Sequence, residues 1–140
     1  MEIPVVGLSL EPTKNSLFDR AQRLGPVPKE FIDIRDIVTV NYFVSQHQPS
    51  IIIHMAAQPL VLESYNTPRE AFKINVMGTT NILSAAFLVP SVIAVGVITT
   101  DKVYQNDDFG RAFVESDALS GKDSYSVSKT ATEAVVKAWQ

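Results

Sequence analysis

The sequence predicts an α/β fold, in which a parallel sheet of about four strands carries helices on both faces. Two observations predict this class. Short apolar, β-branched runs alternate along the chain with longer stretches in which apolar residues recur at helical spacing. The run at residues 51–55 is apolar at almost every position, which is typical of a parallel strand covered on both faces. Strands that alternate with helices are joined by right-handed crossovers. The length of 140 residues suits one domain with a modest core.

The first part of the chain should hold two strands and a short helix. Residues 3–10 form an apolar run that predicts the first strand. Asn15 or Ser16 can cap a short helix that runs to Leu24 and stops at the following glycine. Residues 30–34 are again short and apolar, which predicts the second strand.

The next predicted elements are a helix and a third strand. Asp36 is expected to cap the helix, which should end before Pro49. The third strand is the apolar run at residues 51–55. Small residues follow it at positions 56 and 57. They permit close approach of a ligand or another backbone, but tight packing alone is the commoner reason for such a pair.

A long helix is predicted from Pro68 to Ala86. Thr67 can cap it, Pro68 takes the first helical position, and Glu70 can complete a capping box. A glycine within a helix costs about 1 kcal/mol relative to alanine, so Gly78 indicates close packing against the sheet. Asn75 could be a buried polar group that bonds a nearby loop or a residue of an active site. Its spacing alone favours the first interpretation.

The last predicted elements are a strand, a long connection and a helix. Residues 91–99 form the fourth strand. The connection at residues 101–124 is long for a structureless loop in a compact domain, which favours a functional loop. Asp123 or Ser124 can cap the final helix, which contains no Gly or Pro.

Tyr125 and Lys129 are the first candidates for chemistry. At positions i and i+4 of a helix they project from the same face, and a nearby ammonium favours the phenolate form of a tyrosine. Most such pairs are only a half-buried ring beside a solvated lysine. However, residues 99–102 directly follow a predicted buried strand, and ligands of parallel α/β sheets bind beyond the carboxyl ends of the strands. The two stretches together predict an active site at this edge.

Five motifs in order resemble the extended short-chain dehydrogenase/reductase family, the NAD-dependent epimerases and dehydratases, and within it the CDP-glucose 4,6-dehydratases. The resemblance extends from residue 5 to residue 139. It implies a Rossmann-like fold, NAD as cofactor and a nucleotide sugar as substrate. The motifs are residues 33–36 (DIRD), 54–61 (HMAAQPLV), 75–79 (NVMGT), 100–104 (TDKVY) and 125–129 (YSVSK).

The resemblance implies a set of cofactor-binding residues. Asp33 would bond the adenine amino group, with Ile34 beside the ring. The segment at residues 56–58 would pass the ribose and pyrophosphate of NAD. The other cofactor-binding candidates are Ala56, Ala57, Gln58, Asn75 and Thr99, together with Tyr125 and Lys129.

The resemblance also implies catalytic roles. Tyr125 would take the proton of the sugar 4-hydroxyl as hydride leaves for NAD, while Lys129 would bond the nicotinamide ribose. Thr100 would bond the same sugar hydroxyl, and Asp101 resembles the acid near C6 that assists loss of water. Lys102 stands where dTDP-glucose relatives carry Glu, which favours the CDP-glucose branch. Asp101 and Lys102 could instead be a surface ion pair, which would contribute little to stability.

The chain departs from the family pattern at its start. The family begins with a strand, a Gly-rich turn and a helix, but this sequence has no clustered glycines and resembles the family from its second strand onward. The 140 residues are therefore expected to form an incomplete Rossmann-like, dinucleotide-binding domain. The absent strand would lie between the strands at residues 5–10 and 51–55, where its loss leaves backbone groups without partners.

Three repairs of this gap are open. The first strand could move across to pair with residues 51–55, another chain could supply the strand, or exposed apolar faces could pair in a homodimer. We favour closure of the gap together with dimerisation. For function, we expect weak or no NAD binding and no dehydratase turnover by these residues alone. The alternatives are one chain of a split dehydratase or epimerase and a non-catalytic interaction module.

Overall fold

The computed structural model describes residues 3–14, 16–18, 27–108 and 110–140. It is an α/β structure, which confirms the predicted class. The helix expected between Asn15 or Ser16 and Leu24 lies mostly outside the described residues. The strands are β1 (Gly7–Ser9), β2 (Lys29–Phe31), β3 (Ile51–His54) and β4 (Ala94–Val97). The helices are α2 (Ile37–His47), α3 (Val61–Asn66), α4 (Pro68–Phe72), α5 (Gly78–Phe87) and α6 (Ser124–Ala138), with a π turn at Lys73–Met77 and a 3₁₀ turn at Asp101–Val103.

The four strands form two separate parallel pairs. β1 pairs with β2, and β3 pairs with β4 in a register that sets Ile51 opposite Ala94. We expected the first strand to move across and pair with β3, and this prediction is wrong: no ladder joins β1 to β3 among the described residues. Both pairs pack against the same core cluster, through Leu8 of β1 and Ile52 of β3. The position of β1 thus follows this packing rather than backbone pairing with β3.

The core lies between the strands and a layer formed by α2 and α5. Asp36 caps α2 as predicted, accepting hydrogen bonds from the N–H groups of Val38 and Thr39. The helix ends before Pro49, also as predicted. The buried core residues are Ile34, Val40, Phe43, Val44, Ile82, Ala85 and Val89.

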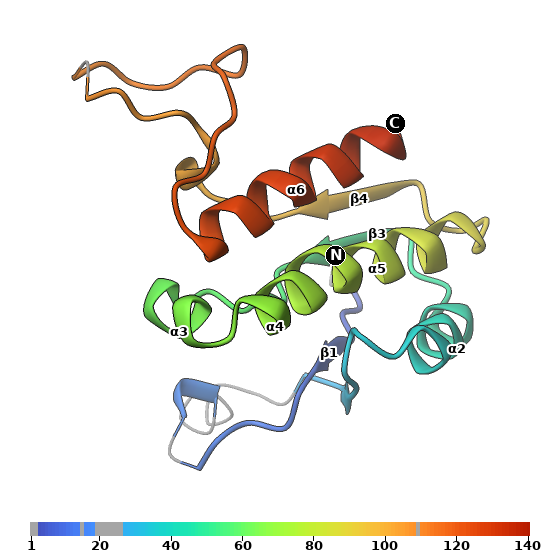
Figure 1. The fold of residues 1–140 in the computed structure, drawn as a ribbon. Coiled ribbons are helices and arrows are strands. Elements are labelled where there is room, and N and C mark those ends of the chain that lie inside the picture. The colour runs from blue at the N-terminus through green and yellow to red at the C-terminus, as the bar shows by residue number, and fades with distance from the viewer. Residues whose placement is uncertain (1–2, 15, 19–26, 109) are drawn as a thin grey trace.

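The described helices gather over one face of the strands. In Figure 1, α5 and α6 lie in front of β3 and β4. Helices were expected on both faces, but the side chains of β3 that point away from the core are solvent-exposed. Ile51 and Ile53 are 57% and 60% exposed, and Met55, just after the strand, is 71% exposed. The described residues therefore leave an apolar sheet face uncovered.

The segment before the long helix differs from its prediction. Pro68 does begin α4, but the capping box at Thr67 and Glu70 does not form. A short helix, α3, immediately precedes Thr67, so the Thr67 hydroxyl donates back to the carbonyl of Glu63 at 3.0 Å. The Glu70 carboxylate is bound by Arg35 and Lys73 instead.

The prediction of close packing at Gly78 is confirmed, although the partner is not a strand residue. A Cβ atom at this position would lie 2.4 Å from Cδ1 of Ile34, which follows β2. Ile34 is 6% exposed, so it has little room to move away. The lack of a side chain at Gly78 therefore lets the start of α5 lie directly against Ile34.

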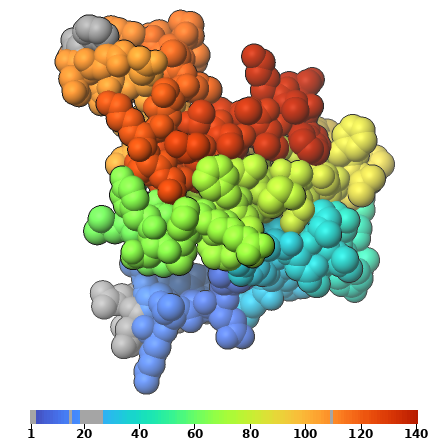
Figure 2. All heavy atoms as spheres, viewed as in Figure 1, coloured from blue at the N-terminus to red at the C-terminus, as the bar shows by residue number. Residues whose placement is uncertain are grey.

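The long connection before α6 is folded and projects from the body of the molecule (Figure 2). An isolated antiparallel bridge joins Tyr104 to Leu119, and the ring of Tyr104 stacks on that of Phe113 with centroids 5.0 Å apart. Arg111 and Asp117 form an ion pair at 2.7 Å. None of the helices in the described ranges combines the length and the apolar character that crossing a bilayer requires.

Candidate functional site

The start of α6 is fixed by two side chains. Asp123 caps the helix as predicted: its carboxylate accepts hydrogen bonds from the N–H of Ser126 at 2.9 Å and from its hydroxyl at 2.6 Å. The N–H of Tyr125, which has no partner within the helix, donates to the Ser64 hydroxyl of α3 at 3.0 Å. The backbone of Tyr125 is therefore held firmly, and the residue is only 9% exposed.

Lys129 lies one turn after Tyr125 and reaches the end of β4. Its Nζ atom donates to the carbonyl of Ile98 at 2.8 Å, and the residue is 4% exposed. Burial lowers the pKa of Lys129, and the charge of Glu133 opposes this effect. Both residues lie on α6, as the sequence predicted, and the lysine is buried rather than solvated.

The predicted residues after β4 have separate contacts. Thr99 donates its hydroxyl hydrogen to Glu133 Oε1 at 2.5 Å. Thr100 caps the 3₁₀ turn at Asp101–Val103, and its hydroxyl lies 3.2 Å from Oδ1 of Asp101. Asp101 and Lys102 are exposed, and no ion pair joins them in the described part of the chain. Their side chains are therefore accessible to a ligand at this end of β4.

Asn75 connects the loop after β3 to α6. It is 1% exposed, and its side chain forms two hydrogen bonds with the backbone of Gln58, one accepted from the N–H and one donated to the carbonyl. Its Nδ2 atom also donates to the Ser128 hydroxyl at 2.8 Å. The interpretation of Asn75 as a buried polar group that bonds a loop is confirmed, and that loop is the predicted cofactor segment.

The backbone carbonyl of Asn75, in the π turn, is shared by two side-chain hydroxyls. This carbonyl accepts hydrogen bonds from the hydroxyls of Thr79 at 2.6 Å and Thr132 at 3.0 Å. His54, at the end of β3, lies 3.0 Å from the Thr79 hydroxyl through Nε2. Because the Thr79 hydrogen is used on Asn75, His54 must donate from Nε2. Burial and then the charge of Lys129 lower the pKa of His54 to about 4, so its ring is neutral at pH 7.

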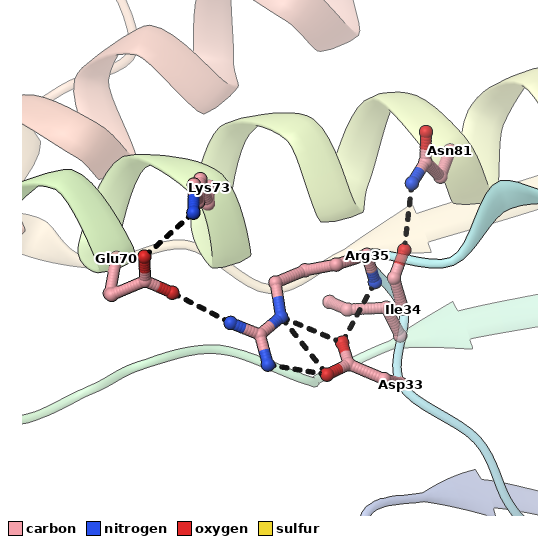
Figure 3. A network of polar contacts seen from close by, with 6 residues as sticks. All are labelled: Asp33, Ile34, Arg35, Glu70, Lys73 and Asn81. Carbon is pink, nitrogen blue, oxygen red and sulfur yellow. Dashed lines mark hydrogen bonds and ion pairs between the residues drawn. The ribbon is translucent and has the colours of Figure 1, made fainter.

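Asp33 belongs to an ion-pair network on the surface (Figure 3). Its carboxylate accepts hydrogen bonds from the Arg35 guanidinium, whose other side binds Glu70 at 2.7 Å. The Arg35 hydrogen bond lowers the pKa of Asp33. Ile34 lies in the core, and its carbonyl accepts a hydrogen bond from Asn81 at 2.9 Å. Asp33 is therefore already engaged by a cation, and the side chain of Ile34 faces the protein interior.

The segment at residues 56–58 is half-buried and carries an unpaired acceptor. Ala56 packs beside the core cluster, and Ala57 follows it along the loop. Gln58 donates its side-chain N–H to the carbonyl of Leu60 at 3.0 Å, whereas its Oε1 atom is buried without a hydrogen-bond partner. A buried acceptor normally has a donor, so this atom is suited to a hydroxyl or amide of a bound molecule.

Several residues of this site were not predicted from the sequence. They are hydroxyl and carboxylate residues that fasten α6 to its neighbours, together with Thr79, which bonds Asn75 and His54 instead. One signal was available, because Ser128 and Thr132 lie four residues apart, as do Lys129 and Glu133, and such pairs share a helix face. Ser64 gave no local signal, and Thr79 lies in the motif at residues 75–79 but was assigned no role of its own. The residues missed are Ser64, Thr79, Ser128, Thr132 and Glu133.

Comparisons with known proteins agree on one family. The model of the GDP-mannose 4,6 dehydratase family matches residues 16–140. The CDP-glucose 4,6-dehydratase of Salmonella typhimurium is 37% identical over 137 residues, which cover 97% of this chain and 38% of that protein. The dTDP-glucose 4,6-dehydratase of Shigella flexneri is 30% identical over 128 residues, covering 79% of this chain and 36% of that protein.

Solved structures show the same fold. A dTDP-glucose 4,6-dehydratase from Streptomyces venezuelae, a double mutant with NAD bound, superposes with a TM-score of 0.83 at 24% identity, covering 96% of this chain and 41% of that one. A UDP-glucose-4-epimerase from Stenotrophomonas maltophila, also with NAD bound, gives 0.80 at 25% identity, covering 95% and 40%. The chain thus spans about two fifths of the length of the relatives it matches.

Proposed function

This chain belongs to the GDP-mannose 4,6 dehydratase family, and from that premise we propose that it is the central part of an NAD-dependent nucleotide-sugar 4,6-dehydratase of the CDP-glucose type. The observation that carries the proposal is the anchored pair on α6: Tyr125 and Lys129 are both buried, and Lys129 reaches the carbonyl of Ile98 at the end of β4. The 140 residues would form one incomplete dinucleotide-binding domain.

Part of the site fits NAD. The buried, unpaired Oε1 of Gln58 offers an acceptor to a cofactor hydroxyl, and Asn75 fixes the backbone of this loop. Lys129 would bind the nicotinamide ribose, and Thr99 lies at the same strand end. The Asp33 carboxylate already accepts hydrogen bonds from Arg35, so it would have to accept one from the adenine amino group beside the guanidinium. The three apolar candidates would contact NAD through their backbone and by packing, because they have no polar side-chain group; they are Ile34, Ala56 and Ala57.

The residues beside the cofactor site suit a dehydration. NAD, when bound, would accept a hydride from the sugar and return it later. Tyr125 would take the proton of the sugar 4-hydroxyl, and Thr100 would hydrogen-bond that hydroxyl. Asp101, exposed at the 3₁₀ turn, would give a proton to the departing C6 hydroxyl so that it leaves as water, while Lys102, as a neutral amine, would accept the proton lost at C5. Lys129 would supply a positive charge near this proton transfer.

The 140 residues alone should bind NAD weakly and should not turn over substrate. The sequence contains no Gly-rich turn, and helix N-termini with such turns are what usually bind a pyrophosphate. Calorimetric titration with NAD should therefore give a dissociation constant above roughly 0.1 mM. Saturation-transfer NMR, which detects weak binding, should show NAD signals that decrease in Lys129→Ala.

Lys137→Ala is the matched control, because Lys137 is an exposed lysine on the same helix. Micromolar affinity would contradict the proposal of weak binding. Equal NAD signals in wild type, Lys129→Ala and Lys137→Ala would contradict the proposed site itself.

A second candidate is one chain of a split dehydratase or epimerase. The observation that favours it is the division of the strands into two pairs that pack under one helical core, with no ladder between β1 and β3 in the described residues. A parallel strand supplied by another chain could pair with both edges and satisfy their backbone groups. Adding a synthetic strand–turn–helix peptide with a Gly-rich turn should then raise NAD affinity, and no change would contradict this candidate.

A third candidate is an interaction module that works as a homodimer. The exposed apolar side chains of Ile51, Ile53 and Met55 favour it, because a second copy could cover them. Light scattering at several concentrations should show a dimer, and Ile53→Lys should make it monomeric. Unchanged mass in Ile53→Lys would exclude this face. Activity that survives Tyr125→Phe would favour the module over both enzymatic candidates.

A further inference from the structure

Helix α6 is attached to the end of β4 at two consecutive points. Lys129 donates to the carbonyl of Ile98 at 2.8 Å, and one helical turn later Glu133 accepts from the hydroxyl of Thr99 at 2.5 Å. Ile98 and Thr99 are neighbours in the chain, and Lys129 and Glu133 are at positions i and i+4, so they project from the same face of α6. A hydroxyl that donates to a carboxylate forms a short, strong hydrogen bond, which fixes the Glu133 carboxylate.

Glu133 supplies the negative charge near a buried cation. Lys129 is 4% exposed and its hydrogen-bond acceptor, a carbonyl, is neutral. The other titratable groups beside it are His54 of β3, which is uncharged at pH 7, and Tyr125 one turn earlier on α6. A buried ammonium without a counter-charge is unfavourable, and Glu133 lies where it reduces this penalty.

We propose that Glu133 is a positioning residue of this site: its carboxylate, held by Thr99, keeps Lys129 as an ammonium directed at the end of β4. Thr99 then acts through Glu133, in addition to the cofactor contact predicted for it. The inference deepens the proposed function, since it concerns the lysine that would bind the cofactor ribose. A purely structural role would be limited to fastening α6 on β4 and would not change the charge state of Lys129.

The test measures the titration of Lys129 in the whole chain without NAD. Selective labelling of lysine with ¹³C and ¹⁵N allows the Cε and Hε signals to be followed against pH, and Lys129→Met identifies the Lys129 signal by its loss. Glu133→Gln keeps a hydrogen-bond acceptor for Thr99 but removes the charge. The Lys129 pKa should be lower in Glu133→Gln than in wild type. Glu115→Gln, which removes an exposed carboxylate from the projecting connection, should leave it unchanged.

A pair of substitutions at Thr99 tests the role of the hydroxyl. Thr99→Ser keeps it and should titrate like wild type, whereas Thr99→Val removes it and should lower the Lys129 pKa, because Glu133 is then free to move into solvent. An unchanged Lys129 pKa in a folded Glu133→Gln variant would overturn the inference. If Glu133→Gln does not fold, equal pKa values in Thr99→Val and Thr99→Ser would overturn it.

The readout is independent of the proposed function. It requires neither NAD nor a sugar nucleotide, so a chain that fails to bind NAD would contradict the proposed function and still report the Lys129 pKa. Conversely, NAD binding with an unchanged Lys129 pKa in Glu133→Gln would support the function and reject the role of Glu133.

Discussion

Asn75 and Gln58 are joined by a pair of hydrogen bonds, in which the Gln58 N–H donates to Asn75 Oδ1 at 2.8 Å and Asn75 Nδ2 donates to the Gln58 carbonyl at 3.2 Å. The two residues are 17 positions apart, one in the π turn and the other in the loop after β3. A single amide side chain thus substitutes for a strand neighbour and holds this loop in one conformation.

Replacing Asn75 should destabilise the fold. In Asn75→Ala the two Gln58 backbone groups and the Ser128 hydroxyl lose a partner, and each unsatisfied buried group costs about 1–3 kcal/mol. We expect the free energy of unfolding in urea to fall by roughly 2–4 kcal/mol. Asn81→Ala is a control on α5 that removes a single hydrogen bond, to the Ile34 carbonyl, and should cost less. Equal losses in the two variants would contradict the special role of Asn75.

A side chain at Gly78 should clash with Ile34. The added Cβ of Gly78→Ala would lie 2.4 Å from Cδ1 and 2.7 Å from Cγ1 of Ile34. Alanine gains about 1 kcal/mol of helix propensity, but overpacking a core typically costs about 1–3 kcal/mol, so we expect a net loss of stability of roughly 1 kcal/mol. In an Ile34→Ala background the clash disappears, so Gly78→Ala should be neutral or stabilising there. A double-mutant cycle in urea measures this coupling, and additive effects would contradict it.

Stability should depend on pH through His54. Its pKa falls from the ordinary value of 6.5 to about 4 in the folded chain, so below pH 6.5 the unfolded chain binds more protons than the folded chain. The contribution is fully present above pH 6.5 and is lost progressively as the pH falls toward 4, by about 3 kcal/mol in all. Urea unfolding between pH 4 and 7 measures the loss.

His54→Gln provides the comparison, because it removes the titrating ring and leaves the carboxylates in place. The stability of wild type should fall more steeply than that of His54→Gln between pH 6.5 and 4. Parallel curves would show that the pKa of His54 is the same in the folded and the unfolded chain, which would contradict the prediction. When His54→Gln is introduced into Lys129→Met, it should change the pH dependence of stability less than it does in wild type. The reason is that the Lys129 charge is the second cause of the lowered His54 pKa.

The cap of α6 should be worth about 1 kcal/mol. Asp123→Ala removes the acceptor for the N–H of Ser126, and loss of an N-cap costs about 0.5–2 kcal/mol. Asp123→Asn keeps a side-chain oxygen and should retain most of this stability. Thermal unfolding followed by circular dichroism distinguishes the two variants, and a full loss in Asp123→Asn would mean that charge rather than the hydrogen bond matters.

Local signals in the sequence predicted the elements well. Asp36 and Asp123 cap their helices as predicted, because an N-cap needs only its own residue and the next few N–H groups. The shared face of Tyr125 and Lys129 follows equally from helix geometry. The capping box at Thr67 failed because a preceding helix, α3, gave the threonine hydroxyl a different acceptor.

Contacts between distant segments were harder to predict. The hydrogen bond from the Tyr125 N–H to Ser64 spans 61 positions, and that from Thr99 to Glu133 spans 34. Each depends on how the strands and helices pack, which no local pattern encodes. Closure of the gap between β1 and β3 was wrong for the same reason: backbone pairing favours it, but the two strand pairs take their positions from packing on one core cluster, which no local pattern encodes.

The π turn at Lys73–Met77 lets the long helix carry one extra residue while the faces on either side of it keep their directions. A π turn accommodates one residue more than an α-helical turn, so loss of a single residue there would give a regular helix from Pro68 onward. The side chains beyond that point would keep nearly the same direction. Thr79 would still face His54, and Gly78 would still lie against Ile34. A one-residue deletion at the regular start of α5 would instead rotate the residues after it by about 100° around the helix axis, with an effect far larger than its size.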